Sequence, residues 1–319
     1  MWKVENETQF EAAGEFIRDM KGRENWVVAI KATFDILPDS SLEPAKEQLA
    51  PNHLPVYFGE EAKSSLQYES DFPLDKQNVD IILNASAHSP YQEPVKELNV
   101  SISLGSISKS LKIIGDRYRV KPFLTKSITD AEEFTSMEIR YEKAYGGWLK
   151  NQKDIIRDNP IGTGSENIEY EQLPNIFYPG KKNKVAGFGA IAGDWQPRLS
   201  LAGTYDEKWQ NERFPLIPTD FDNQFYQFAP LDQQVKSIVG GEQVILENLT
   251  PKGNLRFAVP EKQFQCFSCV EGEIRKHSTK LSTIILEPDF PRIIMVWHSR
   301  ILCNKEDHLL EYTYVKEER

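Results

Sequence analysis

Alternation of apolar and polar residues with a period of two is the main pattern along this chain. Within residues 26–36, WVVAIKATFDI, every second position is apolar: Val28, Ile30, Ala32, Phe34 and Ile36. Lys31, Thr33 and Asp35 lie between them. Such alternation is typical of a strand that has one buried face and one solvated face.

Residues 97–114, ELNVSISLGSISKSLKII, predict a hairpin with a two-residue turn at Gly105-Ser106. This turn places apolar residues opposite each other, in the pairs Leu104–Ile107, Val100–Leu111 and Leu98–Ile113. Serines pair on the other face, as Ser103–Ser108 and Ser101–Ser110, so the register separates apolar from polar side chains. Lys109, opposite Ile102, breaks the pattern, and we expect it near a sheet edge with its stem over apolar surface.

Strand patterns dominate the rest of the chain, whereas helical patterns are few and short. Further strands are predicted within residues 137–143, 243–249, 254–260, 264–270, 281–288, 291–299 and 309–315, with a longer hairpin loop at 248–253. Short helices are predicted within residues 11–20, 206–211 and 232–237. We therefore expect a mainly β protein, with antiparallel sheets packed as a sandwich or an open barrel, few short helices and long irregular loops.

The domain organisation has two interpretations. Residues 1–319 form a single unit, or two β-rich lobes, about 1–146 and 187–319, are joined by the irregular segment 147–186. Such a long irregular connection is uncommon inside a compact domain and is usually functional or mobile.

Composition and charge narrow the classes of partner. The chain has 319 residues, is 39% apolar and carries a net charge of −10, which argues against a nucleic-acid or anionic-membrane partner. The start of the sequence lacks the pattern of a signal peptide, and no apolar run approaches ~18 residues. We therefore expect a cytoplasmic protein.

Glycine is dense in residues 187–209, GFGAIAGDWQPRLSLAGTYDEKW. The spacing of Gly187, Gly189 and Gly193 is one residue longer than that of the dinucleotide fingerprint. Pro197 would also stop the helix that this fingerprint requires. We expect no nucleotide or other cofactor, and interpret the glycines as backbone corners.

Carboxylates near aromatic residues suggest a carbohydrate site, formed by Asp206 or Asp220 beside Trp195 and Trp209. A structural interpretation is favoured, because Asp206 is well placed to begin a helix. Tyr205 and Trp209, four residues apart, would then share one helical face.

The cysteines suggest half of a zinc site, because Cys266 and Cys269 form a C-x-x-C pair that His277, His298 or Cys303 would have to complete. Positions three apart on a strand point to opposite faces, so we predict buried free cysteines and no metal. No G-x-S-x-G motif supports a serine triad. We predict no catalytic residues, so the chain is not expected to be an enzyme.

The order of motifs resembles a known bacterial family. ENETQF is followed by VVAIKATFDI, SLQYESDF, IRYEKAYGG, NPIGTG, LPNI, AGFGAIAGDWQPRLSLAGTYDEKWQ, the AP-x-DQ of Ala229–Gln233 and ENLTP. From about residue 5 to about residue 258, this resembles the family DUF2169. The family signature comprises Gly187, Gly189, Trp195, Arg198, Gly203, Tyr205, Asp206 and Trp209, which we expect to be architectural.

The resemblance implies a role in type VI secretion. Members of the family are regarded as adaptors or chaperones that help load an effector, often with a PAAR-like tip protein, onto the VgrG spike. We predict such a binding protein, with partner-binding loops at Phe177, Tyr178 and Phe225. The alternatives are the carbohydrate-active or carbohydrate-binding module described above and a purely structural component of the secretion machinery.

Overall fold

The fold is mainly β, as the sequence predicts. The computed structural model describes residues 3–120, 127–148, 154–164, 170–181, 183–304 and 309–318. These residues form several mostly antiparallel sheets and two short α-helices, α1 (Arg198–Leu201) and α2 (Glu207–Glu212). The described strands do not close into a barrel. In the same part of the chain, no helix has the length and apolar character needed to cross a membrane.

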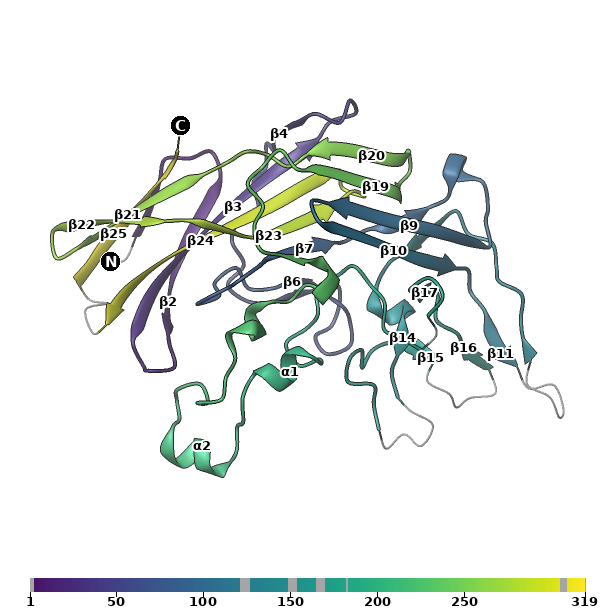
Figure 1. The fold of residues 1–319 in the computed structure, drawn as a ribbon, viewed down its shortest axis with the longest axis horizontal. Coiled ribbons are helices and arrows are strands. Elements are labelled where there is room, and N and C mark those ends of the chain that lie inside the picture. The colour runs from purple at the N-terminus through teal and green to yellow at the C-terminus, as the bar shows by residue number, and fades with distance from the viewer. Residues whose placement is uncertain are drawn as a thin grey trace.

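A seven-stranded sheet forms the centre of the molecule (Figure 1). Its strands, in spatial order, are β18 (Gln234–Val235), β7 (Val79–Leu83), β23 (Lys280–Glu287), β24 (Arg292–Asn304), β3 (Glu24–Ile36) and β2 (Glu11–Arg18), and β4 (Leu42–Pro44) also pairs with β3. β3 and β24 are antiparallel and pair from one end to the other. Only β7 and β23 are parallel among these pairs in the described sheet.

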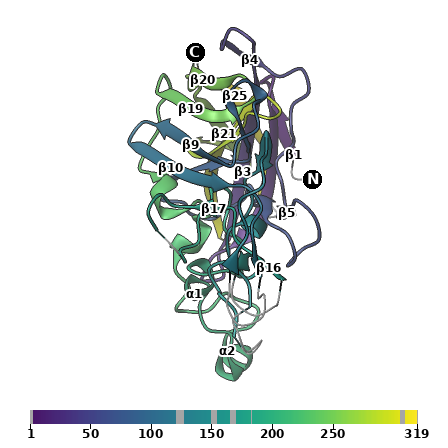
Figure 2. The same ribbon diagram turned by 90° about the vertical axis from the view of Figure 1, so that its right-hand side faces the viewer.

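Two smaller sheets pack against this sheet. The five-stranded sheet contains β17 (Ile176–Phe177), β10 (Ile107–Ile114), β9 (Glu97–Leu104), β19 (Gln243–Thr250) and β20 (Gly253–Ala258). The four-stranded sheet contains β1 (Lys3–Asn6), β25 (Leu310–Glu317), β21 (Phe264–Val270) and β22 (Glu273–Ser278). Even-numbered residues of β3 share one apolar cluster with both sheets, and Figure 2 shows the layered packing. The core therefore lies between sheets that pack face to face.

Three two-stranded pairs and one three-stranded sheet, all of short strands, complete the described structure. They are β5 (Val56–Tyr57) with β6 (Leu66–Tyr68), β8 (Ser86–His88) with β13 (Ser136–Glu138), β14 (Tyr145–Gly146) with β15 (Thr163–Gly164), and β11 (Tyr118–Val120) with β12 (Ser127–Ile128) and β16 (Tyr170–Gln172). Turns of 3₁₀ helix occur at η1 (Pro90–Gln92), η2 (Tyr141–Lys143), η3 (Asn223–Tyr226) and η4 (Leu231–Gln233).

Both large sheets combine strands from before and after the irregular segment 147–186. β3 pairs with β24 in the seven-stranded sheet, and β9 pairs with β19 in the five-stranded sheet. The two lobes considered from the sequence therefore do not correspond to separate sheets.

The hairpin β9–β10 has the predicted register. Leu104 lies opposite Ile107, Val100 opposite Leu111, and the serines pair on the other face. Lys109 lies where β10 has no further neighbour, because β17 pairs only with Lys112 and Ile113. Its ammonium group is nevertheless buried, since Nζ lies 2.8 Å from Oδ1 of Asp232. The predicted position of Lys109 near a sheet edge is confirmed, but its ammonium group does not reach solvent.

The face of β3 that carries Lys31 and Thr33 is not solvated, and this prediction was wrong. Both side chains are buried, and Lys31 Nζ forms an ion pair with Oδ2 of Asp71 at 2.8 Å. The amide of Gln48 donates to the backbone carbonyl oxygen of Thr33 at 2.9 Å. A segment between β4 and β7 thus covers this face, and it supplies polar partners for the polar side chains.

Two helix predictions were also wrong. Residues 11–20 contain β2 instead of a helix, and residues 232–237 contain the end of η4 and β18. β2 pairs with β3 along its whole length, and Gly14 lies against Trp26, whose Cζ2 atom would be 2.1 Å from an added Cβ. The tertiary pairing overrides the helix-favouring residues of this segment. The helix predicted at 206–211 is confirmed as α2.

Candidate functional site

The signature segment, residues 187–209, begins inside the protein. The carbonyl oxygen of Phe188 accepts hydrogen bonds from the backbone N of Leu83 at 3.2 Å and from Nε2 of Gln233 at 2.8 Å. Trp195 is 2% exposed, and its ring meets that of Tyr141 edge-on at a centroid distance of 5.4 Å. The inner part of the segment, residues 187–198, is therefore anchored in the core by Phe188 and Trp195.

Gly187 allows a close approach between backbone and ring. A Cβ atom at this position would lie 2.7 Å from Cε1 of Tyr141. The hydroxyl of the same tyrosine donates to the carbonyl oxygen of Gly189 at 3.1 Å, and burial raises its pKa above the usual range. The first two glycines of the signature thus accommodate a buried tyrosine.

Arg198, at the start of α1, joins three segments. Its Nε donates to the carbonyl oxygen of Phe225 at 2.9 Å, and Nη1 donates to that of Ile191 at 2.7 Å. Nη1 also lies 2.6 Å from Oε2 of Glu69, and the guanidinium stacks over the ring of Phe225. These contacts use two nitrogens of the planar guanidinium group of Arg198. A lysine has a single ammonium group and could not make all of them.

Residues 199–221 form a projection that we call the arm, and Figures 1 and 2 show it extending away from the sheets, with α2 at its tip. Near its base, Gly203 adopts a φ of +83°. The backbone N and Oγ1 of Thr204 both donate to the carboxylate of Asp220, at 3.0 and 2.7 Å. These hydrogen bonds lower the pKa of Asp220. They also link the outgoing and returning segments of the arm to each other near its base.

Three aromatic residues, Tyr205, Trp209 and Phe214, form what we call the aromatic tip. Asp206 is the N-cap of α2, as predicted, since its Oδ1 accepts a hydrogen bond from the backbone N of Trp209 at 2.8 Å. Trp209 is half-buried, and the rings of Tyr205 and Phe214 pack against it at 4.7 and 5.7 Å. Tyr205 is 55% exposed and Phe214 is 67% exposed, so the tip presents apolar surface to solvent.

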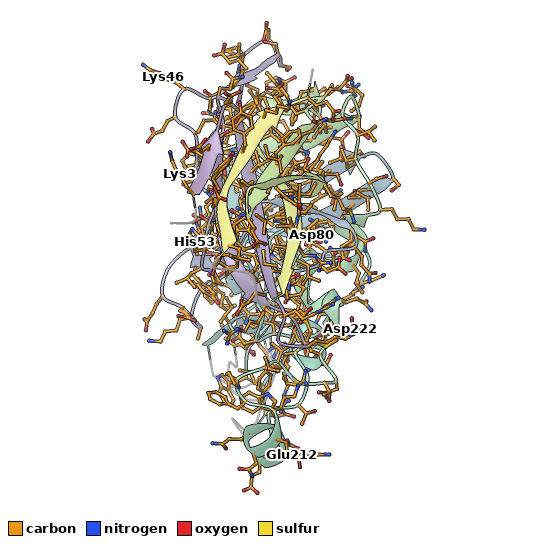
Figure 3. The ribbon with its side chains drawn as sticks, turned by 90° about the vertical axis from the view of Figure 1, so that its left-hand side faces the viewer. Lys3, Lys46, His53, Asp80, Glu212 and Asp222 are labelled. Atoms are coloured by element: carbon orange, nitrogen blue, oxygen red, sulfur yellow. The ribbon has the colours of Figure 1, made fainter. Side chains whose placement is uncertain are left out.

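The tip is held against the body at the β2–β3 turn. Arg213 donates through Nη2 to the carbonyl oxygen of Met20, and through Nε to that of Ile217 at 2.8 Å. Figure 3 shows Glu212, at the end of α2, far from Asp80 in the central sheet. The aromatic tip is therefore an exposed surface on an anchored projection.

The loop residues predicted to bind a partner are only partly exposed. Phe177 lies under the guanidinium of Arg117, at 5.5 Å from ring centroid to Cζ. Tyr178 donates its hydroxyl to Oδ2 of Asp232 at 2.9 Å, and burial with this carboxylate raises its pKa above the usual range. Phe225 covers Arg198. All three side chains are half-buried and contribute to packing.

A cleft of about 500 Å³ lies between the inner signature segment and Ala229–Gln234. Residues 183–187 and 196–198 form one side, and η3, η4 and the two residues before β7 contribute to the other. The side chains of Gln77, Asn78, Asn183 and Gln196 line this cleft, and none of them makes a hydrogen bond to the described residues. We call it the amide cleft.

A buried polar cluster supports the wall of this cleft. Lys109 Nζ lies 2.8 Å from Oδ1 of Asp232 and donates to Oε1 of Gln233 at 2.7 Å. Burial lowers the pKa of Lys109 to about 8, although the nearby Asp232 carboxylate opposes this shift. The AP-x-DQ motif thus fixes the wall by pairing with the residue that interrupts the β9–β10 pattern.

Sequence reasoning missed the amide cleft as a site. Its free amides come from positions as distant as Gln77 and Gln196, and each reads as an ordinary polar loop residue. The sequence signals near it were the AP-x-DQ motif, whose Asp232 and Gln233 hold one wall, and the signature residues Gly187 and Arg198, which were interpreted as architectural.

The arrangement gives no support to a carbohydrate site made by Asp206 or Asp220 beside the tryptophans. Trp195 is buried, and the two carboxylates act as a helix cap and as the partner of Thr204.

The described residues also lack an arrangement of side chains suited to a metal ion. No group of three or more His, Cys, Asp or Glu side chains is placed there to hold an ion. Cys266, Cys269 and Cys303 are all buried, as predicted.

Comparison with known proteins identifies the family. No curated protein and no solved structure matches this chain. One family model matches residues 21–298, further towards the C-terminus than the motifs alone suggest. That match covers most of the chain, including the signature segment, the arm and the AP-x-DQ motif. The chain therefore belongs to the family described as an uncharacterized protein conserved in bacteria, DUF2169.

Proposed function

We propose that this chain is a non-enzymatic adaptor or chaperone of type VI secretion. It acts in the cytoplasm, where it binds an effector or its PAAR-like carrier and helps load it onto the VgrG spike. The family resemblance suggests the pathway. The observation that supports a binding role is the aromatic tip, because exposed Tyr205 and Phe214 flank Trp209 at the end of an anchored arm.

Exposed aromatic side chains are suited to the centre of a protein interface. Stable interfaces bury roughly 1,200–2,000 Å², and a few Trp, Tyr and Arg residues supply most of their binding energy. In the tip, Trp209 is fixed by a 2.8 Å hydrogen bond from Nε1 to the carbonyl oxygen of Leu216. A rigid aromatic group loses little conformational freedom when a partner covers it.

Co-expression tests this proposal. The chain is produced with the effector and the PAAR-like protein encoded beside its gene, and a defined complex is expected to co-purify. Replacing two exposed tip residues, Tyr205→Ser with Phe214→Ser, is expected to weaken that complex at least tenfold. Phe290→Ser is the matched control, because Phe290 and Phe214 are both 67% exposed. Melting curves establish that each variant is folded.

Two results together would overturn the proposal. One is that neither partner co-purifies with the unaltered chain. The other is that secretion of the neighbouring effector continues after deletion of this gene.

A further inference from the structure

The amide cleft has the composition of a site for a polypeptide. Gln77, Asn78, Asn183 and Gln196 line it without any hydrogen bond from their side chains to the described residues. A carboxamide both donates and accepts hydrogen bonds, which is also what a peptide group does. The volume of about 500 Å³ lies within the usual range of roughly 300–1,000 Å³ for ligand sites.

The charges in the cleft favour an occupant that carries both signs. Arg198 and Asp232 are already paired, with Glu69 and Lys109 respectively. Asp158 and Lys184 also line the cleft, are exposed, and form no ion pair within the described part of the chain. A polypeptide can present a cation to Asp158 and an anion to Lys184, whereas a neutral ligand pairs with neither charge.

A sugar is a poorer fit, because two of the three aromatic rings that line the cleft, those of Tyr141 and Tyr178, are already in use, and the third, Tyr145, is half-buried. The ring of Tyr141 is buried between Gly187 and Trp195. Tyr178 has three ammonium groups near its ring, those of Lys184, Lys109 and Lys181, at 4.7, 5.3 and 5.8 Å from the centroid. Sugar sites usually need an open aromatic face, and these two rings offer little of one.

Apolar side chains complete the lining. Ile156, Val185, Ile191 and Leu201 are half-buried, so they combine partial exposure with a fixed position. Leu231, at 77% exposure, lies beside the paired Asp232. Peptide sites commonly combine main-chain hydrogen bonds, which supply affinity, with small apolar pockets that select side chains.

We propose that the amide cleft binds an extended polypeptide segment of the secretion partner, with its free amides paired to the main chain of that segment. This inference deepens the adaptor function proposed above and rests on it for the identity of the partner. The aromatic tip and the cleft are then two separate contacts on one protein, so their effects can be tested independently.

Peptide selection tests the cleft without knowledge of the partner. Random 12-residue peptides displayed on phage are selected against the purified chain, and an enriched peptide is labelled with fluorescein for anisotropy titration. Asn183→Ala combined with Gln196→Ala is expected to weaken binding at least tenfold. Gln210→Ala on α2 is the matched control, because this exposed glutamine lies outside the cleft and its side chain makes no hydrogen bond to the described residues.

Two further experiments identify the groups of the peptide that the cleft recognises. Methylation of individual peptide nitrogens is expected to reduce affinity, because it removes the N–H groups that donate hydrogen bonds to the side-chain amide oxygens of the cleft. Lys184→Glu is expected to shift the selected sequences from acidic towards basic residues. Tyr205→Ser with Phe214→Ser is expected to leave peptide affinity unchanged.

Three outcomes would overturn the cleft proposal: no peptide is enriched, the enriched peptides are indifferent to the cleft variant, or a glycan array shows binding that depends on the same amides. If the effector co-purifies but any of these occurs, only the cleft proposal fails. If no partner co-purifies and secretion continues after deletion of the gene, the adaptor function fails, while the peptide titrations still decide whether the cleft is a peptide site.

Discussion

The two ends of the signature segment have similar residues and different environments. Trp195, at the inner end, is 2% exposed and meets Tyr141 in the core. Tyr205, ten residues later, is 55% exposed at the end of the arm. A motif dense in glycine and aromatic residues therefore combines a structural part, residues 187–198, with a surface part, residues 199–209. A single role for the whole motif would miss this difference.

The largest expected effect comes from removal of the inner tryptophan. Trp195→Ala is expected to lower the free energy of unfolding by ~3–5 kcal/mol, because it leaves a large cavity beside Tyr141. Tyr205→Ala is the control and is expected to change this free energy by no more than about 1 kcal/mol. Urea denaturation of both variants measures the difference. Equal losses would show that the two ends of the segment do not differ as described.

A smaller effect is expected when the contact between backbone and ring is disturbed. Gly187→Ala is expected to destabilise the protein by ~1–3 kcal/mol, since the added Cβ would lie 2.7 Å from Tyr141 and force it to move. Gly189→Ala should have little effect, because there the nearest atom of the same ring is 3.7 Å away. Thermal melts of the two variants provide the measurement. The explanation fails if Gly189 proves the more sensitive position.

At the outer end, loss of the helix cap should have a local effect. Asp206→Ala removes the acceptor for the backbone N of Trp209 and is expected to destabilise α2 by ~1 kcal/mol. Hydrogen exchange of that amide should become faster, while exchange in β3 and β24 stays the same. Glu207→Ala provides the control, because Glu207 is exposed and its side chain makes no hydrogen bond to the described residues. Faster exchange throughout the sheets would mean that the arm is not an independent part.

The smallest effect concerns the protonation of Asp220. Its pKa lies below the ordinary value because the hydroxyl and the backbone N of Thr204 donate to its carboxylate. A lowered pKa in the folded state contributes stability above the ordinary carboxyl pKa, and that contribution is lost as the pH falls through the folded value. Thr204→Val is expected to raise the pKa of Asp220 towards its ordinary value.

Carbon-13 NMR of the side-chain carboxyl groups measures this change. Asp39 is an internal control, because its pKa is lowered by Ser41 and should not respond to the variant. An unchanged titration of Asp220 would contradict the role given to Thr204.

The parts of the fold that sequence predicted are those that local patterns determine. The β9–β10 register follows from a two-residue turn and from alternation on both strands, and these signals lie within 18 residues. α2 follows from the cap at Asp206. By contrast, β2 forms because β3 lies beside it and Gly14 accommodates Trp26, and neither partner can be read from residues 11–18 alone.

The candidate site was predictable only in part, for the same reason. The position of Asp206 at a helix start could be read directly from the sequence. Whether Asp206 or Asp220 lies beside the tryptophans in a carbohydrate site could not be read from it. Likewise, the pattern of β3 indicates which residues alternate, while the burial of Lys31 depends on Asp71, 40 residues away. The free amides of the cleft converge only through the tertiary fold.

The pairing of β3 with β24 affects how the protein is made. During synthesis, β3 leaves the ribosome long before residues 292–304 exist, and its neighbour on that side is missing until then. At ~5–20 residues per second, the delay is on the order of tens of seconds. During this time an apolar strand of 13 residues has an unsatisfied edge. Until residues 292–304 have been translated, this edge of β3 can therefore pair with another chain instead of with β24.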